Sequence, residues 1–126
     1  MAIQTLQQQY AGKVYKQVED FGQEHPGKDN KGRKEYGSMA HKLPVLVRQA
    51  GLIQALAYVD TRGKDAQKKL LDHLAETLGY DRTSLLEQAR NADLQAYMLL
   101  TRKTLWALEW YKRFAQSVLG VEPGSD

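Results

Sequence analysis

The sequence predicts an all-α fold, a single-domain bundle over residues 1–126 with about five or six helices and a long C-terminal helix. Apolar residues recur at three- and four-residue steps through most of the chain, which places them on one side of a helix. No segment shows the strict alternation of apolar and polar residues that is typical of a half-buried strand. The 126 residues, of which 42% are hydrophobic and 26% are charged, suffice for one core but not for two.

The first predicted helix spans residues 2–21, and a loop is expected to follow it. Gly22 stands where a glycine in the left-handed conformation would end the helix. Residues 22–33 contain three glycines and one proline but almost no apolar side chain, which predicts a mobile basic loop. The residues expected on the buried side of the helix are Ile3, Leu6, Tyr10, Val14, Val18 and Phe21.

The helical pattern resumes near Arg33 and continues to Ala50, with Gly51 as its predicted end. Proline lacks a backbone N–H and collides with the preceding turn, so the helix is expected to kink or to begin again at Pro44, where an undistorted helix would lose about 3 kcal/mol. The predicted core side is formed by Tyr36, Met39, Leu43, Leu46, Val47 and Ala50. The opposite side is a polar, basic surface formed by Lys34, Ser38, His41, Lys42, Val45, Arg48 and Gln49.

Two shorter helices are predicted next. Residues 52–62 form a strongly apolar segment that ends at Gly63. Asp65 is placed to cap the N-terminus of the following helix, and Gly79 is placed to end it. The buried side of that helix is expected to consist of Leu70, Leu71, Leu74 and Leu78.

The C-terminal part is predicted to contain one short and one long helix. Residues 81–90 form the short helix after a tight turn. Asp93 then begins a helix of about 27 residues, which would be about 40 Å long at a rise of about 1.5 Å per residue. Because this helix is apolar around most of its circumference, we expect it to be the central helix of the bundle. Residues 121–126 are expected to be a frayed tail.

Positive charge is concentrated in the N-terminal part of the chain. The formal net charge is +3 and the pI is about 9.1. Residues 1–50 contain eight Lys or Arg and five Asp or Glu, so 8 − 5 = 3, whereas residues 51–126 contain ten of each kind. The small basic excess therefore belongs to the first half of the sequence, where an anionic partner would be contacted.

Cysteine usage and hydropathy restrict the compartment. The sequence contains no cysteine, which excludes a disulfide framework and thiolate metal sites and fits a reducing environment. The first 13 residues contain no apolar leader, and no apolar run approaches the length of about 18 residues that a membrane span needs. We expect a cytoplasmic protein that does not associate with a membrane.

A search for catalytic residues is largely negative. The motifs of zinc proteases, serine hydrolases, P-loop proteins and dinucleotide-binding proteins are missing, and no two histidines have a metal-binding helical spacing. Asp72, His73 and Glu76 lie within about one turn and could bind a metal or transfer a proton in a small hydrolase. Such triplets are common on polar helices, so a solvated surface is the favoured interpretation. We expect no enzyme activity, no catalytic residue, no metal and no cofactor.

Two clusters are candidates for binding. Residues 28–34 carry four basic side chains and one acidic one, so 4 − 1 = 3, and a flexible loop next to a helix would let these charges adapt to phosphates. A solubilising loop would have the same composition. In the second cluster, arginines and tryptophans alternate and could stack on bases, although anchors in the core or in a subunit interface are favoured. The second cluster consists of Arg102, Lys103, Trp106, Trp110 and Arg113.

One segment combines several features that together resemble a known family. These features are the pairs Tyr36 with Gly37, Leu43 with Pro44 and Gly51 with Leu52, and the run from Ala55 to Tyr58. With them the segment is similar to the small helical subunit of the type III-B CRISPR effector, the RNA-guided Cmr complex. The likeness extends more loosely over most of the chain, through the long first helix, the basic loop and the long last helix.

The resemblance implies a non-catalytic scaffold. In that family several copies stack beside the repeated guide-binding subunits, and together they border a groove in which guide RNA pairs with target RNA. The implied partners are other Cmr subunits, further copies of this chain, and guide and target RNA, which would be contacted along the backbone without sequence preference. The implied RNA contacts are first Lys42 and Arg48, and then His41, Lys34, Arg33, Lys31 and Lys28.

The implied subunit interface consists of Val45, Trp106, Trp110, Arg102 and Arg113. Two alternatives stay open: a helical adaptor that binds only proteins through the tryptophan region, and the analogous small subunit of the related type III-A complex. A net charge of +3 is low for a protein that binds RNA alone. An isolated subunit is therefore expected to bind single-stranded RNA only at low salt, and tight binding would require several copies.

Overall fold

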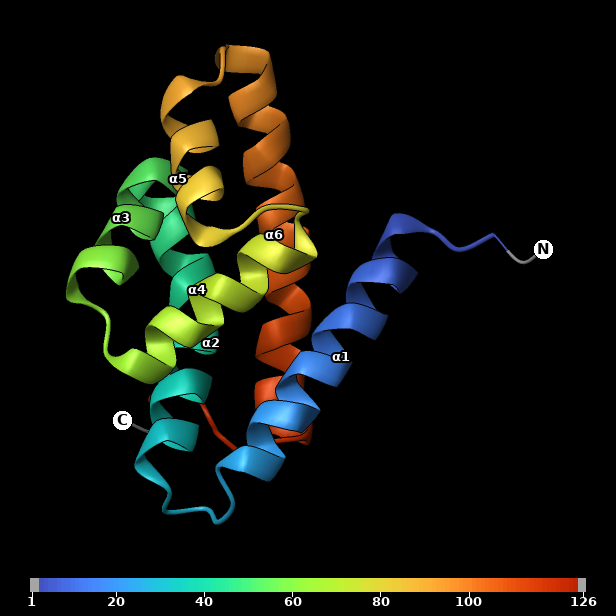
Figure 1. Ribbon diagram of the computed structural model, residues 1–126, viewed down its shortest axis with the longest axis vertical. Helices are drawn as coiled ribbons and strands as arrows, with labels where there is room; N and C mark the ends of the chain where they lie inside the picture. The colour runs from blue at the N-terminus through green and yellow to red at the C-terminus, as the bar shows by residue number, and fades with distance from the viewer. Residues whose placement is uncertain (1–2, 125–126) are drawn as a thin grey trace.

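The computed structural model describes residues 3–124, which form six α-helices and no strand (Figure 1). The predicted all-α bundle with a long last helix is confirmed. Two predicted features, the helix start at residue 2 and the tail residues 125–126, lie outside the described residues. The helices are α1 (Leu6–Glu24), α2 (Lys31–Ala50), α3 (Leu52–Arg62), α4 (Asp65–Thr77), α5 (Arg82–Asn91) and α6 (Leu94–Ser117).

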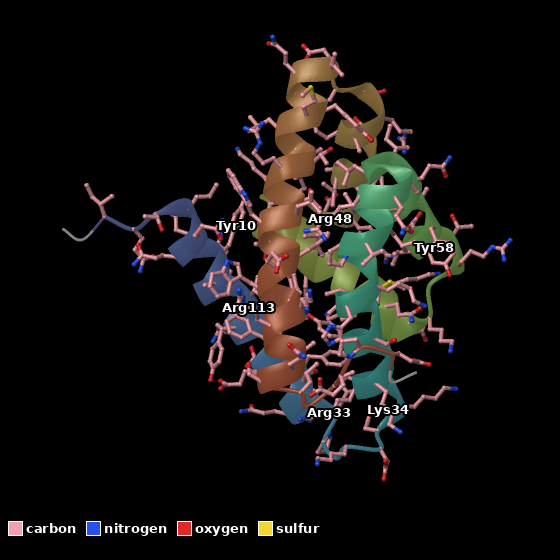
Figure 2. All side chains as sticks on the ribbon, turned by 180° about the vertical axis from the view of Figure 1, so that it is seen from behind. Tyr10, Arg33, Lys34, Arg48, Tyr58 and Arg113 are labelled. Atoms are coloured by element: carbon pink, nitrogen blue, oxygen red, sulfur yellow. The ribbon has the colours of Figure 1, made fainter. Side chains whose placement is uncertain are left out.

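The helices are arranged in two layers. α1, α6 and α2 lie side by side in one layer, which faces the viewer in Figure 2. α4 crosses the other side of this layer, and α3 and α5 pack beside α4 (Figure 1). α1 and α6 run in roughly the same direction, whereas α2 runs in the opposite direction (Figure 1). The first layer therefore presents one broad face that the three shorter helices do not cover (Figure 2).

The most enclosed part of the bundle is the middle of α2. Every residue from 35 to 41 is buried, on all sides of the helix. Gly37 makes this possible, because a Cβ atom there would lie only 2.5 Å from the Cβ of Val121. α6 instead buries a single stripe, so the prediction that the C-terminal helix is the central one is wrong, and α2 occupies that place. The buried stripe of α6 consists of Leu100, Thr104, Ala107, Leu108, Tyr111 and Ala115.

The first helix and the loop after it differ from the prediction at both ends. α1 begins after Thr5, whose hydroxyl accepts from the backbone N–H of Gln8 while the Gln8 side chain accepts from the N–H of Thr5. Ile3 precedes this cap and is 94% exposed, so its predicted burial is wrong. Gly22 lies inside α1 and does not end it. Its missing side chain makes room for Leu119, which would lie 3.0 Å from a Cβ atom added at this position. The predicted loop at 22–33 shrinks to residues 25–30.

The ends of the other helices largely follow the sequence. α2 continues through Pro44 without beginning again, and Gly51 ends it with φ of 91°. Gly79 has φ of 92° directly after α4, which confirms its role as a left-handed C-terminal residue. Lys64, not Asp65, is the N-cap of α4, and Asp65 is the first residue of the helix.

The segment after α6 is only partly a tail. Residues 121–126 were expected to be frayed, but Val121 is 4% exposed and packs against Gly37. Its backbone oxygen accepts a hydrogen bond of 2.8 Å from Nε2 of His41. The chain therefore folds back after Ser117, and residues 118–121 cover one side of α2.

Candidate nucleic-acid interface

Arg33 was expected to bind RNA, but in the structure its guanidinium contacts backbone groups of the bundle itself. Its guanidinium donates four hydrogen bonds to backbone carbonyls at the C-terminal ends of two helices. The Nε atom donates to the oxygen of Leu119 at 2.9 Å, and Nη2 to Val118 at 3.2 Å. The Nη1 atom donates to Gly22 at 3.0 Å and to His25 at 3.1 Å. A helix end leaves its last carbonyls without partners, and Arg33 satisfies such groups on both α1 and α6.

His41 was also expected on the exposed basic side of α2, and this placement is wrong. It is 7% exposed, and its ring donates to the backbone of Val121. Ser38, from the same predicted surface, is buried as well. The physical reason is the returning segment 118–121, which covers the first half of that helix side. Of the predicted surface, Lys34 at the start of the helix and the residues beyond His41 reach solvent.

The part that stays exposed is a row along α2, formed by Lys42, Val45 and Arg48 at three-residue steps; we call it the basic row. Val45 is 47% exposed, so its predicted exposure is confirmed. Nη2 of Arg48 lies 3.5 Å from Oε1 of Glu109 on α6, and both side chains are about half exposed. Figure 2 shows Arg48 on the open face of the first layer, between α2 and α6.

The basic side chains around the 25–30 loop lie at the far end of the same helix. Lys28 and Lys31 are exposed, and Lys34 is partly exposed with its ammonium 3.5 Å from the carboxylate of Asp29. Figure 2 places Lys34 at the start of α2, well away from Arg48. The loop and the basic row are therefore two separate positive regions, and Arg33 does not join them.

The residues of the predicted arginine and tryptophan cluster on α6 lie on three different surfaces of the structure. Trp106, Trp110 and Arg113 line one depression of about 300 Å³ together with Gln7 and Glu109; we call it the tryptophan depression. Arg102 lies on a different surface, beside Tyr97, Met98, Thr101 and Leu105. Lys103 lies toward α4 and α5, near Leu78, Tyr80 and Gln88. Spacing on one helix placed the five residues together, but the neighbouring helices separate them.

Sequence reasoning missed an exposed apolar surface on the first half of α6. Leu94, Met98 and Leu105 follow one another along this side with Arg102 among them, and we call these four residues the apolar side of α6. Leu94 is 73% and Met98 54% exposed. Their apolar character was read as a sign of the core, because spacing cannot distinguish a buried side from one that no other helix of the chain covers.

The possible catalytic triplet has structural roles. Nε of Arg82 donates to Asp72 at 2.8 Å, and the hydroxyl of Tyr36 lies 2.7 Å from Nδ1 of His73. Burial lowers the pKa of His73 to about 4, with Lys69 adding to the effect, and burial raises the pKa of Tyr36. Within residues 3–124, no group of three acidic, histidine or cysteine side chains is placed to hold a metal ion. The favoured interpretation as a solvated surface holds for Glu76, which is exposed, but not for His73, which is partly buried against Tyr36.

The long helices raise the question of a membrane span. Among the described residues, no helix combines the length and the apolar character that crossing a membrane requires.

Comparison with known proteins decides the family. The sequence profile of a family described as "CRISPR-associated protein (Cas_Cmr5)" matches residues 6–118. The chain belongs to the Cmr5 family. A Thermus thermophilus protein described as "CRISPR system Cmr subunit Cmr5" is 51% identical over 118 residues, which are 93% of this chain and 98% of that protein. The X-ray crystal structure of a Cmr5 family protein from the same organism aligns with a TM-score of 0.83 at 51% identity, over 92% of this chain and 98% of that one.

The match to the Cmr5 family confirms the resemblance that the segment from Tyr36 to Tyr58 indicated. It begins at the first residue of α1 and ends at the C-cap of α6, Val118. All the surfaces described above, the basic row, the tryptophan depression and the apolar side of α6, therefore lie within the part of the chain that matches the family.

Proposed function

We propose that this chain is a non-catalytic, architectural subunit of a type III-B CRISPR ribonucleoprotein in antiviral defence, and that it contacts RNA along the open face of its first layer. The observation that carries this proposal is the 51% identity, over nearly the whole chain, to a protein described as a Cmr subunit. Its partners would be the other Cmr subunits, including the repeated guide-binding subunit, and further copies of itself.

The proposed RNA contacts are those positive side chains that reach solvent. Lys42 and Arg48 in the basic row come first, and Lys28, Lys31 and Lys34 around the 25–30 loop come second. Arg33 and His41 are left out, because the carbonyl groups of the bundle already engage them. Contacts of this kind neutralise phosphates and do not read bases, so we expect binding without sequence preference.

Arg48 can change partner at little cost. Its contact with Glu109 is 3.5 Å long and joins two side chains that are about half exposed. Exposed ion pairs of this type contribute about 0–1 kcal/mol, so a phosphate could replace the carboxylate without a large loss in stability. With only two strong contacts in the row, one subunit is expected to bind weakly, and stacked copies would add their contacts along one strand.

Contacts to other protein subunits are proposed for the apolar side of α6 and for Val45. Exposed large apolar side chains in successive turns of one helix are typical of a surface that another protein covers. Arg102 lies among them and would contribute the long, partly apolar side chain that interfaces favour. Val45 belongs to the basic row, and Leu105 precedes Glu109, the partner of Arg48, by about one turn of α6, so we expect protein and RNA contacts close to each other.

The test is the double substitution Lys42→Glu and Arg48→Glu. Binding of fluorescently labelled single-stranded RNA at low salt should fall strongly, and binding of target RNA by a reconstituted Cmr complex should weaken, while the circular dichroism spectrum stays unchanged. The matched control is Arg62→Glu with Arg90→Glu, which changes the net charge equally on exposed positions of α3 and α5.

Three results would contradict the proposal. Equal losses in the two double variants would show that only the net charge matters. A collapsed circular dichroism spectrum for the first variant would show that its side chains are structural. Normal assembly with the other Cmr subunits and no response of RNA binding to either salt or substitution would favour an adaptor that binds proteins alone.

A further inference from the structure

We propose that the tryptophan depression takes an unpaired nucleobase of the single-stranded RNA whose phosphates lie along the basic row. This inference rests on the proposed RNA contact and adds a second kind of recognition to it. The depression lies at the start of α1 and along α6, on the same open face as Arg48 and Arg113 (Figure 2). Its lining includes both tryptophans of the chain.

Neighbouring side chains hold the Trp110 ring of the depression in place in the free protein. Nε1 of Trp110 donates to Oε1 of Gln7 at 2.8 Å, which satisfies the only polar group of the indole. The ring of Trp110 stacks on Phe114 with their centroids 5.7 Å apart, and the guanidinium of Arg113 lies 5.9 Å from the Trp110 ring. Trp106 is 37% exposed and supplies the accessible ring surface. A flat partner that stacks here would therefore find the Trp110 side of the site already ordered.

The charges around the depression decide which class of partner fits. Glu109 lines it and is shared with Arg48, while Arg113 lies on the other flank, so the three groups sum to 2 − 1 = +1. The carboxylate disfavours a phosphate inside the depression, and the two arginines disfavour a lysine or arginine side chain. A neutral ring that carries phosphates on both sides satisfies both conditions, because the ring can stack while the phosphates reach the arginines.

The depression is continuous with the basic row. Glu109 is the link, since it lines the depression and pairs with Arg48. A strand that follows Lys42 and Arg48 and then crosses α6 at Glu109 would reach Trp106. Every base has an aromatic face, so stacking of this kind adds affinity without adding sequence preference, in agreement with the contacts proposed for the row.

The experiment compares two strands of the same length and charge, one of mixed-sequence RNA and one that lacks the bases. At low salt, the full-length chain is expected to bind the RNA more tightly than the abasic strand. Trp106→Ala should reduce RNA binding by about 5- to 150-fold, the range for loss of one stacked base, and leave abasic binding unchanged. Trp106→Phe, which keeps a ring, should recover most of the loss. The control is Tyr58→Ala, an aromatic residue of α3 that is 47% exposed.

Intrinsic fluorescence gives a second readout, because the chain has only two tryptophans and both line the depression. The RNA should quench this fluorescence, and the abasic strand should not. Equal affinity for the two strands, together with loss of both in the basic-row double variant, would overturn the base site and leave the proposed function intact. If neither strand binds at low salt, both proposals fail. If Trp106→Ala releases a protein subunit and keeps the preference for bases, the depression is a protein-docking site.

Discussion

Replacing Arg33 tests whether its guanidinium is a structural group or an RNA contact. In Arg33→Ala, four backbone carbonyls at the ends of α1 and α6 lose their donor. An intramolecular hydrogen bond contributes about 0.5–1.5 kcal/mol net, so four would sum to about 2–6 kcal/mol. Arg33 is only partly buried, and water can reach some of these carbonyls in the variant. We therefore expect the free energy of unfolding to fall by about 3 kcal/mol, a large part of the total for a domain of this size.

The assay for Arg33 is urea denaturation followed by circular dichroism. The neighbouring variant Lys34→Ala is the matched control, because it removes a partly exposed ion pair with Asp29 and should change the free energy by less than about 1 kcal/mol. Arg33→Lys keeps the charge but cannot reach four carbonyls in a fixed fork, so an intermediate loss is expected. An Arg33→Ala protein as stable as the control, with weakened RNA binding, would refute the structural role.

Two further predictions concern the core. Gly37→Ala should destabilise the bundle by about 1–3 kcal/mol through overpacking, because the new Cβ would lie 2.5 Å from Val121. Gly12→Ala on α1, where a Cβ would meet no other part of the protein within 4 Å, should stabilise the bundle by about 0.5–1 kcal/mol. Urea denaturation measures both changes. The folded-state pKa of His73 is lowered to about 4, below its unfolded value of about 6.5, so the unfolded chain binds more protons between these values. The stability that neutral, partly buried His73 contributes is fully present above about pH 6.5 and is lost as the pH falls toward 4. The wild type should therefore lose more stability between pH 7.5 and 5 than His73→Gln does.

Helical periodicity accounts for the parts of the fold that were predicted well. Tyr36, Met39 and Leu43 repeat at the spacing of one helix side, and all three are buried as expected. The left-handed glycines at 51 and 79 were equally predictable, because glycine alone adopts that conformation without strain. Both the spacing of apolar residues and the conformation of a glycine depend on neighbouring residues in the sequence, so the sequence alone predicts them.

Contacts between distant parts of the chain explain the failures. His41 was predicted to be exposed because it lies opposite the apolar residues of α2, and Arg33 because it belongs to the basic cluster at residues 28–34. Their partners Leu119 and Val121 lie 86 and 80 residues away in sequence. No helical pattern indicates that the segment after α6 returns over α2. One signal was present, since Gly37, Ser38 and Ala40 are small and allow a close approach, but it does not say which segment approaches. The same limit applies to the apolar side of α6.

The return of residues 118–121 over α2 has a consequence for biosynthesis. A ribosome makes α2 well before the covering segment, so the middle of the central helix cannot be enclosed until residues 118–121 have been translated. Until then the groove around Gly37, which Val121 later fills, is open to the surroundings. A nascent chain that still lacks this segment exposes apolar surface, which is the kind of surface that favours aggregation and that chaperones bind. The enclosure of α2 therefore comes only after all six helices have been made.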